Sequence, residues 1–341
     1  MVHGDGSLSV KNEALPEMGA KEILMKTAAS LISAGTETGG IKGARANPRE
    51  ADPRKTGYST AGTVVAIGDE VTEFAIGDRI IGMAGECYHH ADYNVGHPQM
   101  ATHIPEGMSF DDAVMVCLAA TSLQAVRRVD PKLGEFIAVV GQGLVGQFAD
   151  QLFALSGARV AGIDLDERRL EIAAAHGTEI TINPESQDMT QTLVEWADGA
   201  GIDGSLMAYG GDGSKVVTAL SNATLKAPDT HQVGRIAIVG GVKAEMSFPT
   251  AYGNLDILPS SRTGPGYHDP DYHMGQDYPR AYVRWTTRRN MDELLRLIDT
   301  RSFVVSDLIT HRFAFEDAAE AFNTIIAGEE HTLGVLLEYG D

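Results

Sequence analysis

Apolar and polar residues alternate along the first third of the chain in short stretches that glycines separate. Residues Glu22–Ala28 and Gly62–Gly68 alternate with a period of two, which is typical of half-buried β-strands. Turn residues at Gly68–Glu70 and at Gly77–Asp78 mark the ends of such strands. The pattern predicts a β-rich domain in this part of the chain.

From Phe136 onward, apolar strands alternate with helices. Phe136–Val140 is continuously apolar, as expected for a strand of a parallel sheet that is covered on both faces. Ala158–Ile163 and Arg235–Val239 are strands of the same type, and helical stretches such as Glu167–His176 lie between them. This alternation predicts an α/β fold with a doubly wound parallel sheet.

Local signals predict several further elements. Ser109 can cap a helix that continues through Asp112, three residues later. Residues 264–289 break the alternation, because they are rich in glycine, proline, tyrosine, histidine and aspartate, and we expect an insertion or long loop there. Beyond it the periodicity predicts two helices and a strand, at Asn290–Ile298, Phe315–Ala327 and Leu333–Tyr339.

Composition and charge narrow the classes of function. A length of 341 residues suits two domains. The formal net charge of -20 argues against binding to nucleic acid or to an anionic membrane surface, and no apolar run approaches the ~20 residues of a membrane span. Cys87 and Cys117 are too few for a four-cysteine zinc site. The segment Met1–Gly6 resembles no secretion signal, so we expect a cytoplasmic protein.

A glycine motif directly follows the first apolar strand. Gly141, Gly143 and Gly146 form a GxGxxG pattern with a strand before it and a helix after it. Gly141 would make the tight turn, Gly143 would let the backbone approach a pyrophosphate, and Gly146 would allow close packing of helix and strand. The amino end of the helix offers free N–H groups to the phosphates. The context predicts a dinucleotide site.

Asp164 ends the next strand, close to the expected offset of ~20 residues from the motif. A carboxylate there accepts hydrogen bonds from both hydroxyls of the adenine-side ribose and repels a 2′-phosphate. For two charges ~4 Å apart at an effective dielectric of ~20, the interaction is about 4 kcal/mol. The sequence therefore favours NAD(H) over NADP(H).

With these residues placed, nearly the whole chain resembles the medium-chain dehydrogenase/reductase family. The resemblance implies a GroES-like catalytic domain at 1–121 and 290–341, and a Rossmann NAD-binding domain at 122–289, with 264–289 as an insertion, lid or dimer loop. The markers are the glycine motif together with Ser33–Glu37, Gly57–Val65, Ile76–Ile80, Val160–Leu165 and Leu308–Phe313.

The chain departs from the family pattern where zinc-dependent members hold their metal. Ala34 and Tyr58 stand where those members have a cysteine and a histidine ligand, and only Cys117 matches a ligand position. One thiolate cannot replace three protein ligands, so we expect no catalytic metal. Residues Glu86–Asp92 and His97 gather potential ligands, either for a different metal or, as we favour, as an ordinary polar loop.

Without zinc, hydrogen-bond donors must manage the substrate oxygen while the nicotinamide supplies the hydride chemistry. Thr36 matches the family hydroxyl that relays a proton, and Tyr58 adds a phenol at the lost histidine position. We expect both to be catalytic, although Tyr58 is as well explained as a space-filling aromatic. The residues assigned to the cofactor are Thr121, Gly141, Gly143, Leu144, Val145, Gly146, Asp164, Arg169, Val239 and Gly240.

Three functions stay open at this point. The favoured one is reversible oxidation of a secondary alcohol by NAD, on a polar substrate of sugar or cyclitol type, because residues 262–285 look like a branch of the family associated with such compounds. The second is reduction of a C=C bond conjugated to a carbonyl, and the third is a non-catalytic NAD sensor. A homodimer is expected, paired through an edge strand near Leu255–Ser260.

Overall fold

The computed structural model describes residues 1–328 and 331–340, which divide into two compact units. Unit 1 comprises Met1–Ala120 and Thr263–Asp341, and unit 2 comprises Thr121–Arg262. The chain passes from unit 1 to unit 2 within helix α2 (Phe110–Val129). No helix in the described part of the chain is long and apolar enough to cross a membrane.

Unit 1 is built on a seven-stranded sheet with the order β14-β15-β1-β2-β3-β5, in which β4 also pairs with β1. Alternation along β1 buries every second residue from Ile23 to Ala29, as the sequence pattern predicts, and the last three residues of the strand are all buried. The strands of this sheet are β1 (Ile23–Leu31), β2 (Thr60–Ile67), β3 (Arg79–Gly82), β4 (Tyr93–Gly96), β5 (Ala101–His103), β14 (Ile309–Ala314) and β15 (Gly334–Glu338). The helices are α1 (Thr36–Ala46), α7 (Pro270–His273), α8 (Thr287–Asp299) and α9 (Ala318–Ala327), with 3-10 turns at Pro98–Met100, Ser306–Leu308 and Phe315–Asp317.

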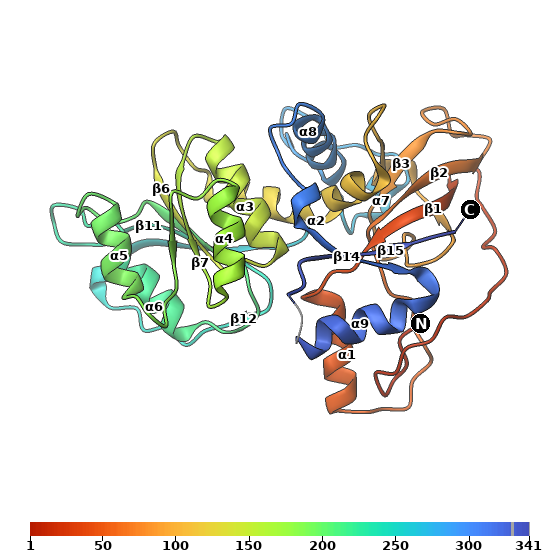
Figure 1. Ribbon diagram of the computed structural model, residues 1–341. Helices are drawn as coiled ribbons and strands as arrows, with labels where there is room; N and C mark the ends of the chain where they lie inside the picture. Colours follow the sequence, from red (N-terminus) through yellow and green to blue (C-terminus); the bar gives the residue numbers. More distant parts are fainter. Residues whose placement is uncertain (329–330, 341) are drawn as a thin grey trace. The chain divides into compact units, whose positions relative to one another are not determined.

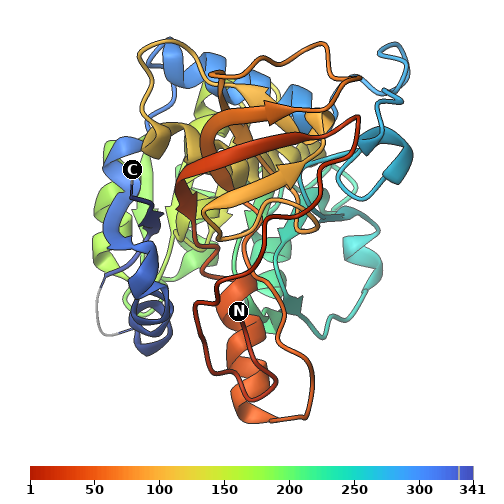
Figure 2. The same ribbon diagram turned by 90° about the vertical axis from the view of Figure 1, so that its right-hand side faces the viewer.

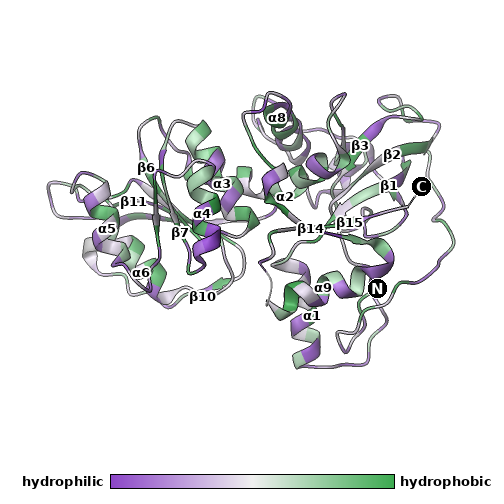
Figure 3. Ribbon diagram, in the orientation of Figure 1, coloured by the Kyte–Doolittle hydropathy of each residue, from purple (hydrophilic) through white to green (hydrophobic). Residues whose placement is uncertain are grey.

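Helix α1 packs against α9 on unit 1 (Figures 1 and 2). Ile41 of α1 and Phe322 of α9 belong to one buried cluster, which Val335 and Leu337 of β15 complete. The helix α8 is amphipathic, with hydrophobic and hydrophilic stretches alternating along it (Figure 3). Its buried side includes Met291, Leu294 and Leu295. These contacts hold the C-terminal part of the chain on the sheet of unit 1.

Unit 2 is a six-stranded parallel sheet with the order β13-β11-β9-β6-β7-β8 (Figure 1). Helices α3 and α4 pack on β6, β7 and β8, whereas α5 and α6 contribute to a cluster with Ala138, Val140 and Ile163. The strands are β6 (Phe136–Val140), β7 (Arg159–Ile163), β8 (Ile180–Ile182), β9 (Gly204–Met207), β11 (Val233–Val239) and β13 (Asn254–Ser260), with a small β10 (Gly211–Asp212) and β12 (Val242–Lys243) pair. The helices are α3 (Leu144–Leu155), α4 (Glu167–Ala175), α5 (Met189–Trp196) and α6 (Ser214–Ala223), with a 3-10 turn at Thr250–Tyr252.

The elements agree with the expected α/β fold, which combines a β-rich catalytic-type unit and a doubly wound sheet. Ser109 does cap α2, because its Oγ accepts a hydrogen bond from the N–H of Asp112 at 3.0 Å. Gly77 adopts φ +97°, a left-handed conformation that suits the predicted turn. Helices and strands also form at 287–299, 318–327 and 334–338, where periodicity predicts them.

The segment 264–289 differs from the expectation, because it lies with unit 1 and not with unit 2. Thr263 and Pro265 are hydrogen-bonded to α8. Asn290 Nδ2 donates to the carbonyl of Thr263 at 2.8 Å, and the N–H of Thr287 donates to the carbonyl of Pro265 at 2.9 Å. The Tyr272 hydroxyl lies 3.0 Å from Oγ1 of Thr286. The first bond joins residues on either side of 264–289 and the other two join residues within it, so the segment folds back on the start of α8.

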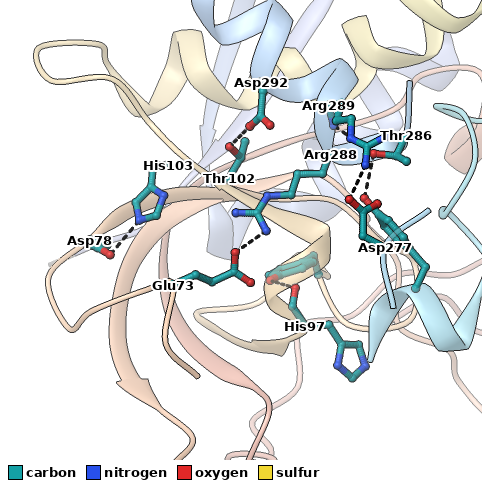
Figure 4. Close-up of polar contacts among 12 residues, drawn as sticks. Glu73, Asp78, His97, Thr102, His103, Asp277, Thr286, Arg288, Arg289 and Asp292 are labelled. Atoms are coloured by element: carbon teal, nitrogen blue, oxygen red, sulfur yellow. Dashed lines mark hydrogen bonds and ion pairs between the residues drawn. The ribbon is translucent and has the colours of Figure 1, made fainter. Parts of the chain in front are cut away.

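Figure 4 shows polar contacts that join α8 and the insertion to the rest of unit 1. Arg288 of α8 forms an ion pair with Glu73 at 2.6 Å. Asp292 accepts a hydrogen bond from Thr102 of β5, and Arg289 pairs with Asp277 of the insertion. Because α8 contacts both the sheet and the insertion, it holds residues 264–289 in unit 1.

Candidate functional site

The glycine motif lies in unit 2 at the point where the strand order reverses. The chain runs from β6 to β7 and β8 on one side and returns to β9 on the other, so the loop after β6 sits at the switch point, where α/β sheets bind ligands. Gly141 has φ +94°, and a Cβ there would meet the Ala208 carbonyl oxygen at 2.9 Å. A Cβ on Gly146 would lie 1.9 Å from the carbonyl oxygen of Gly141. Both glycines are therefore required by the packing of the protein itself.

Gly143 is different, because a Cβ on it would meet no protein atom within 4 Å. The protein has no packing reason for glycine there, whereas a pyrophosphate approaching the backbone would need one. Gly143 also stands at the N-cap of α3 without any side-chain cap, so the first N–H groups of the helix, at Leu144 and Val145, can meet an anion. The loop fits a dinucleotide.

Asp164 directly follows β7 and points toward the glycine loop. Its Oδ2 accepts the backbone N–H of Gln142 at 2.6 Å, and its Oδ1 accepts that of Asp166 at 2.9 Å. Arg169 lies 3.9 Å from Oδ2 and 3.7 Å from the Asp166 carboxylate. The carboxylate of Asp164 is 12% exposed. The structure thus brings Asp164, Arg169 and the glycine loop together.

The remaining cofactor candidates lie around the same loop. Gly240, after β11, has φ +107°, and a Cβ there would approach the carbonyl oxygen of Tyr209 at 2.8 Å. Val239 ends β11 and is buried. Thr121 precedes Ser122, whose Oγ donates to the carbonyl of Val145 at 2.8 Å, so this part of α2 lies beside the start of α3.

The two catalytic candidates lie in unit 1, on neighbouring segments. Thr36 is the first residue of α1 and is exposed, whereas Tyr58 is half-buried and precedes β2. Thr56 Oγ1 donates to Oε2 of Glu37 at 2.7 Å. This bond joins the two segments, because Glu37 directly follows Thr36 and Thr56 lies two residues before Tyr58. Gly57, between Thr56 and Tyr58, has φ +100°, and a Cβ there would lie 2.4 Å from the N atom of His90.

The donor set at the family's zinc position does not fit a catalytic zinc. Ala34 offers no side-chain ligand, and Tyr58 replaces an imidazole with a phenol. Cys117 is fully buried, with its Sγ 3.7 Å from the carbonyl oxygen of Gly82. Burial raises the pKa of the Cys117 thiol to about 12, against the lowering effect of hydrogen bonds from Thr60 and Ser59. In residues 1–328 and 331–340, no group of three His, Cys, Asp or Glu side chains could hold a metal.

The side chains of 86–97 turn to separate partners. Glu86 pairs with His268 at 3.0 Å. His97 lies 4.0 Å from Glu22, and its ring centre is 5.7 Å from that of His273. Burial raises the pKa of the Cys87 thiol to about 12. The polar-loop interpretation of this segment stays a prediction.

The sequence analysis did not single out one buried pair of titratable side chains in unit 1. His90 Nε2 lies 3.0 Å from Oε2 of Glu37, and Nδ1 of the same ring lies 2.7 Å from Oγ of Ser30. Ser30 in turn is 2.9 Å from the hydroxyl of Tyr339. Sequence analysis could identify Glu37, because it follows Thr36 within one of the family motifs. It could not identify the pair, because His90 lies 53 residues away along the chain.

Two family models match the chain side by side. The model of the alcohol dehydrogenase GroES-like domain matches residues 19–124, and the model described as zinc-binding dehydrogenase matches residues 145–267. The first range lies mainly in unit 1 and the second mainly in unit 2.

Individual proteins are similar over different lengths. An uncharacterized zinc-type alcohol dehydrogenase-like protein of Haemophilus influenzae is 26% identical over 90% of this chain and 89% of its own length. D-guloside 3-dehydrogenase of Escherichia coli is 32% identical over 155 residues, which are 43% of this chain and only 44% of that enzyme. Galactitol-1-phosphate dehydrogenase of Escherichia coli has a similar structure, with a TM-score of 0.78 and 18% identity over 98% of both chains.

Both units, the glycine loop at the switch point and the paired family models lead to one assignment. The chain belongs to the medium-chain dehydrogenase/reductase family of oxidoreductases.

Proposed function

We propose that the protein is a zinc-independent oxidoreductase that uses NAD(H) to interconvert a secondary alcohol and a ketone on a polar small molecule of sugar or cyclitol type. The observation that carries this proposal is the placement of Asp164 beside a glycine loop that fits a dinucleotide. The cofactor, the proton-handling residues and the substrate are argued separately below.

The cofactor would be held by the amino end of α3 and by Asp164. The N–H groups after Gly143 would bind the pyrophosphate, and the Asp164 carboxylate would accept hydrogen bonds from the adenine-side ribose. Arg169 offsets part of the charge of Asp164, but Asp166 and Glu167 add two further carboxylates at the start of α4. The local excess of negative charge disfavours a 2′-phosphate, so NAD(H) is the preferred form.

A bound nicotinamide supplies the hydride chemistry. The chain itself must bind the substrate oxygen and manage one proton as the charge on that oxygen changes. Thr36 and Tyr58 carry hydroxyls on two segments that the Thr56–Glu37 bond joins. We assign the donor and acid/base roles to these two residues, and the assignment is supported because no group of three His, Cys, Asp or Glu side chains among residues 1–328 and 331–340 could hold the metal that polarises the oxygen in other dehydrogenases.

The substrate class is supported by the names of similar proteins. D-guloside 3-dehydrogenase oxidises a sugar derivative by its name, and galactitol-1-phosphate dehydrogenase is named for a phosphorylated polyol. The polar insertion at 264–289 is rich in hydroxyl, imidazole and guanidinium groups, although Tyr278 and Arg289 already bond to Asp269 and Asp277. A polyhydroxylated substrate suits such a surface.

A screen of candidate substrates tests the proposal. Polyols, cyclitols, their ketones and conjugated enones are each incubated with NAD(H) and with NADP(H), and nicotinamide absorbance is followed. We expect turnover of a polyol or cyclitol with NAD(H). Turnover of enones alone would contradict the proposal and favour reduction of a conjugated C=C bond. Nicotinamide binding without turnover of any compound would favour a sensor.

We also propose that the protein forms a homodimer through β13. This strand is the last of its sheet and pairs with β11 along all seven of its residues, from Asn254 to Ser260. Its other edge can pair with β13 of a second copy across a two-fold axis, which would extend the sheet.

A further inference from the structure

A cavity in unit 1 takes no part in the proposed function. Its volume is about 170 Å³. Its walls come from residues 8–16 before β1, from the loop that precedes β4, and from α9 with the turn before it. Among the described residues, the lining includes neither Thr36 nor Tyr58 nor any of the cofactor candidates. The cavity is therefore distinct from the residues assigned to catalysis and to the cofactor.

Apolar and aromatic residues form much of the lining. Phe315 and Phe322 contribute from the helical side, and Leu8 and Pro16 contribute from the segment before β1. His90 also lines the cavity, and its ring meets that of Phe322 edge to face, with the ring centres 5.8 Å apart. Because aromatic rings attract one another in edge-to-face and offset arrangements, this lining suits a further aromatic ring.

The polar side chains beside these rings are already bonded within the protein. His90 contacts Glu37 through Nε2 at 3.0 Å and Ser30 through Nδ1 at 2.7 Å. Thr56, which also lines the cavity, donates from Oγ1 to Glu37. In the part of the chain that the structure describes, none of the buried side-chain atoms without a hydrogen-bond partner belongs to a lining residue. The lining thus leaves no buried donor or acceptor for a ligand to satisfy.

The charged side chains of the lining compensate one another. The carboxylate oxygens of Glu13 lie 3.2 Å from Nζ of Lys11 and 3.2 Å from Nζ of Lys55. Asp92 adds a second exposed carboxylate. The amine of Met1 is hydrogen-bonded, and burial lowers its pKa. Because two lysines are matched by two carboxylates, the lining favours neither a cation nor an anion.

Apolar side chains also stand exposed at this cavity. Val10 is 46% exposed, Leu15 is 56% exposed and Tyr93 is 37% exposed, and all three belong to the lining. Exposed apolar residues that gather at one place are typical of an interaction site. The fold therefore leaves hydrophobic surface uncovered where the aromatic cavity lies.

We propose that this cavity binds a small uncharged aromatic molecule with a single ring. The size of the ligand follows from the volume, because an apolar cavity of about 150 Å³ can hold benzene. Its lack of charge follows from the balanced side chains, and its apolar character follows from the hydrogen bonds that the lining already makes within the protein. The ring packs against Phe315 and Phe322 and gains contact with Val10 and Leu15.

Toluene is the probe, and its binding to the full chain is followed by saturation-transfer NMR with and without NADH. We expect saturable binding that NADH does not displace. Benzoate and benzylamine carry a charge on a similar ring and should bind at least about 10-fold more weakly. Toluene binding that does not saturate or that NADH displaces, or equal affinity for a charged analogue, would overturn the inference.

Two pairs of variants locate the bound ring. Ala319→Phe on α9 fills the cavity and should abolish binding, whereas Ala327→Phe, at an exposed position of the same helix, should not. Leu15→Ser removes an exposed apolar side chain and should weaken binding about 5-fold. Its control is Leu133→Ser, because Leu133 is 87% exposed and lies outside the lining.

Wild-type affinity for toluene in Ala319→Phe or in Leu15→Ser would also overturn the inference. If Ala319→Phe does not fold, Leu15→Ser decides, because this change leaves the buried core intact. The proposed function is tested separately by the nucleotide: a protein that binds toluene but neither NADH nor NADPH would contradict the proposed function and leave this inference standing.

Discussion

Nε2 of His90 lies 3.0 Å from Oε2 of Glu37, and the two side chains are 3% and 5% exposed. Glu37 also accepts hydrogen bonds from the N–H of Ser33 at 2.9 Å and from Thr56 at 2.7 Å. Burial acts to raise the pKa of Glu37, but the charge of His90 and the three donors outweigh it and lower the pKa. This pair joins the start of α1 to the loop before β4, next to both catalytic candidates.

Glu37→Gln should destabilise unit 1 by about 1.5–3 kcal/mol at pH 7, because it replaces a buried carboxylate that is hydrogen-bonded to His90, Ser33 and Thr56. Since the pKa of Glu37 is lowered in the folded protein, its stabilisation is complete above the ordinary value of 4.5 and is lost as the pH falls through the folded value. The difference in melting temperature between wild type and variant should therefore shrink below pH 4.5.

The matched control is Glu13→Gln, the same change at an exposed carboxylate that pairs with Lys11 and Lys55. Surface pairs contribute little, so its melting temperature should stay close to that of the wild type. A wild-type melting curve for Glu37→Gln at pH 7 would mean that the buried pair adds nothing to stability.

Cofactor selection should depend on Asp164. Its carboxylate is fixed by two backbone N–H groups and is 12% exposed, so it keeps one orientation. We expect NAD(H) to be preferred over NADP(H) by at least about 10-fold, and Asp164→Ser to narrow this gap by about 10–100-fold, or about 1.4–2.8 kcal/mol. The preference is measured as the ratio of kcat/KM with NAD(H) to kcat/KM with NADP(H). Equal values for the wild type would refute the assignment.

Signals that act over a few residues were sufficient to predict much of this fold. The Ser109 cap, the alternating strand at Ile23–Leu31 and the strand before Gly141 all depend on neighbours in sequence. The membership of 264–289 in unit 1 was not predictable in that way, because it depends on bonds such as Asn290 to Thr263, across 27 residues.

The same limit applies to the candidate site. The spacing of Gly141, Gly143 and Asp164 could be recognised because the motif and the next strand follow each other directly. The burial of Glu37 and of Asp150 could not be predicted, because a carboxylate has no sequence pattern that reveals its burial. Long-range packing determines whether such a group is ionised and what it orients.

Metal removal should leave activity unchanged. Ala34 and Tyr58 supply no zinc-type ligand set with Cys117, whose thiol has a pKa of about 12 in the protein as it stands. We expect full activity after prolonged dialysis against a chelator, and far less than one zinc per chain by elemental analysis. Stoichiometric metal, with activity lost on its removal and restored on its return, would show that the proposal of zinc independence is wrong.

The proposed dimer can be tested by sedimentation. β13 contributes Leu255, Ile257 and Leu258 as half-buried apolar side chains, and its outer edge is available for pairing. We expect the mass of two chains at micromolar concentration. Ile257→Pro should shift the protein toward the monomer, because proline removes an N–H and disrupts the strand. A wild-type monomer at these concentrations would refute pairing through β13.

The sharpest test of the mechanism is Tyr58→Phe. The change keeps the ring of a half-buried side chain and removes only its hydroxyl, so the fold around Gly57 and Ser59 should persist. Loss of a preorganised donor to a developing oxyanion costs about 10²–10³ in kcat, and we expect a fall of at least about 30-fold, roughly 2 kcal/mol. The dissociation constant for NAD should not change, because the cofactor candidates lie on other segments. A near-normal kcat would mean that Tyr58 is only a space-filling aromatic, and the proton-transfer role would then be assigned to Thr36. If Thr36→Val also has a near-normal kcat, neither hydroxyl takes part in catalysis. That result would contradict alcohol oxidation by these residues and favour reduction of a conjugated C=C bond.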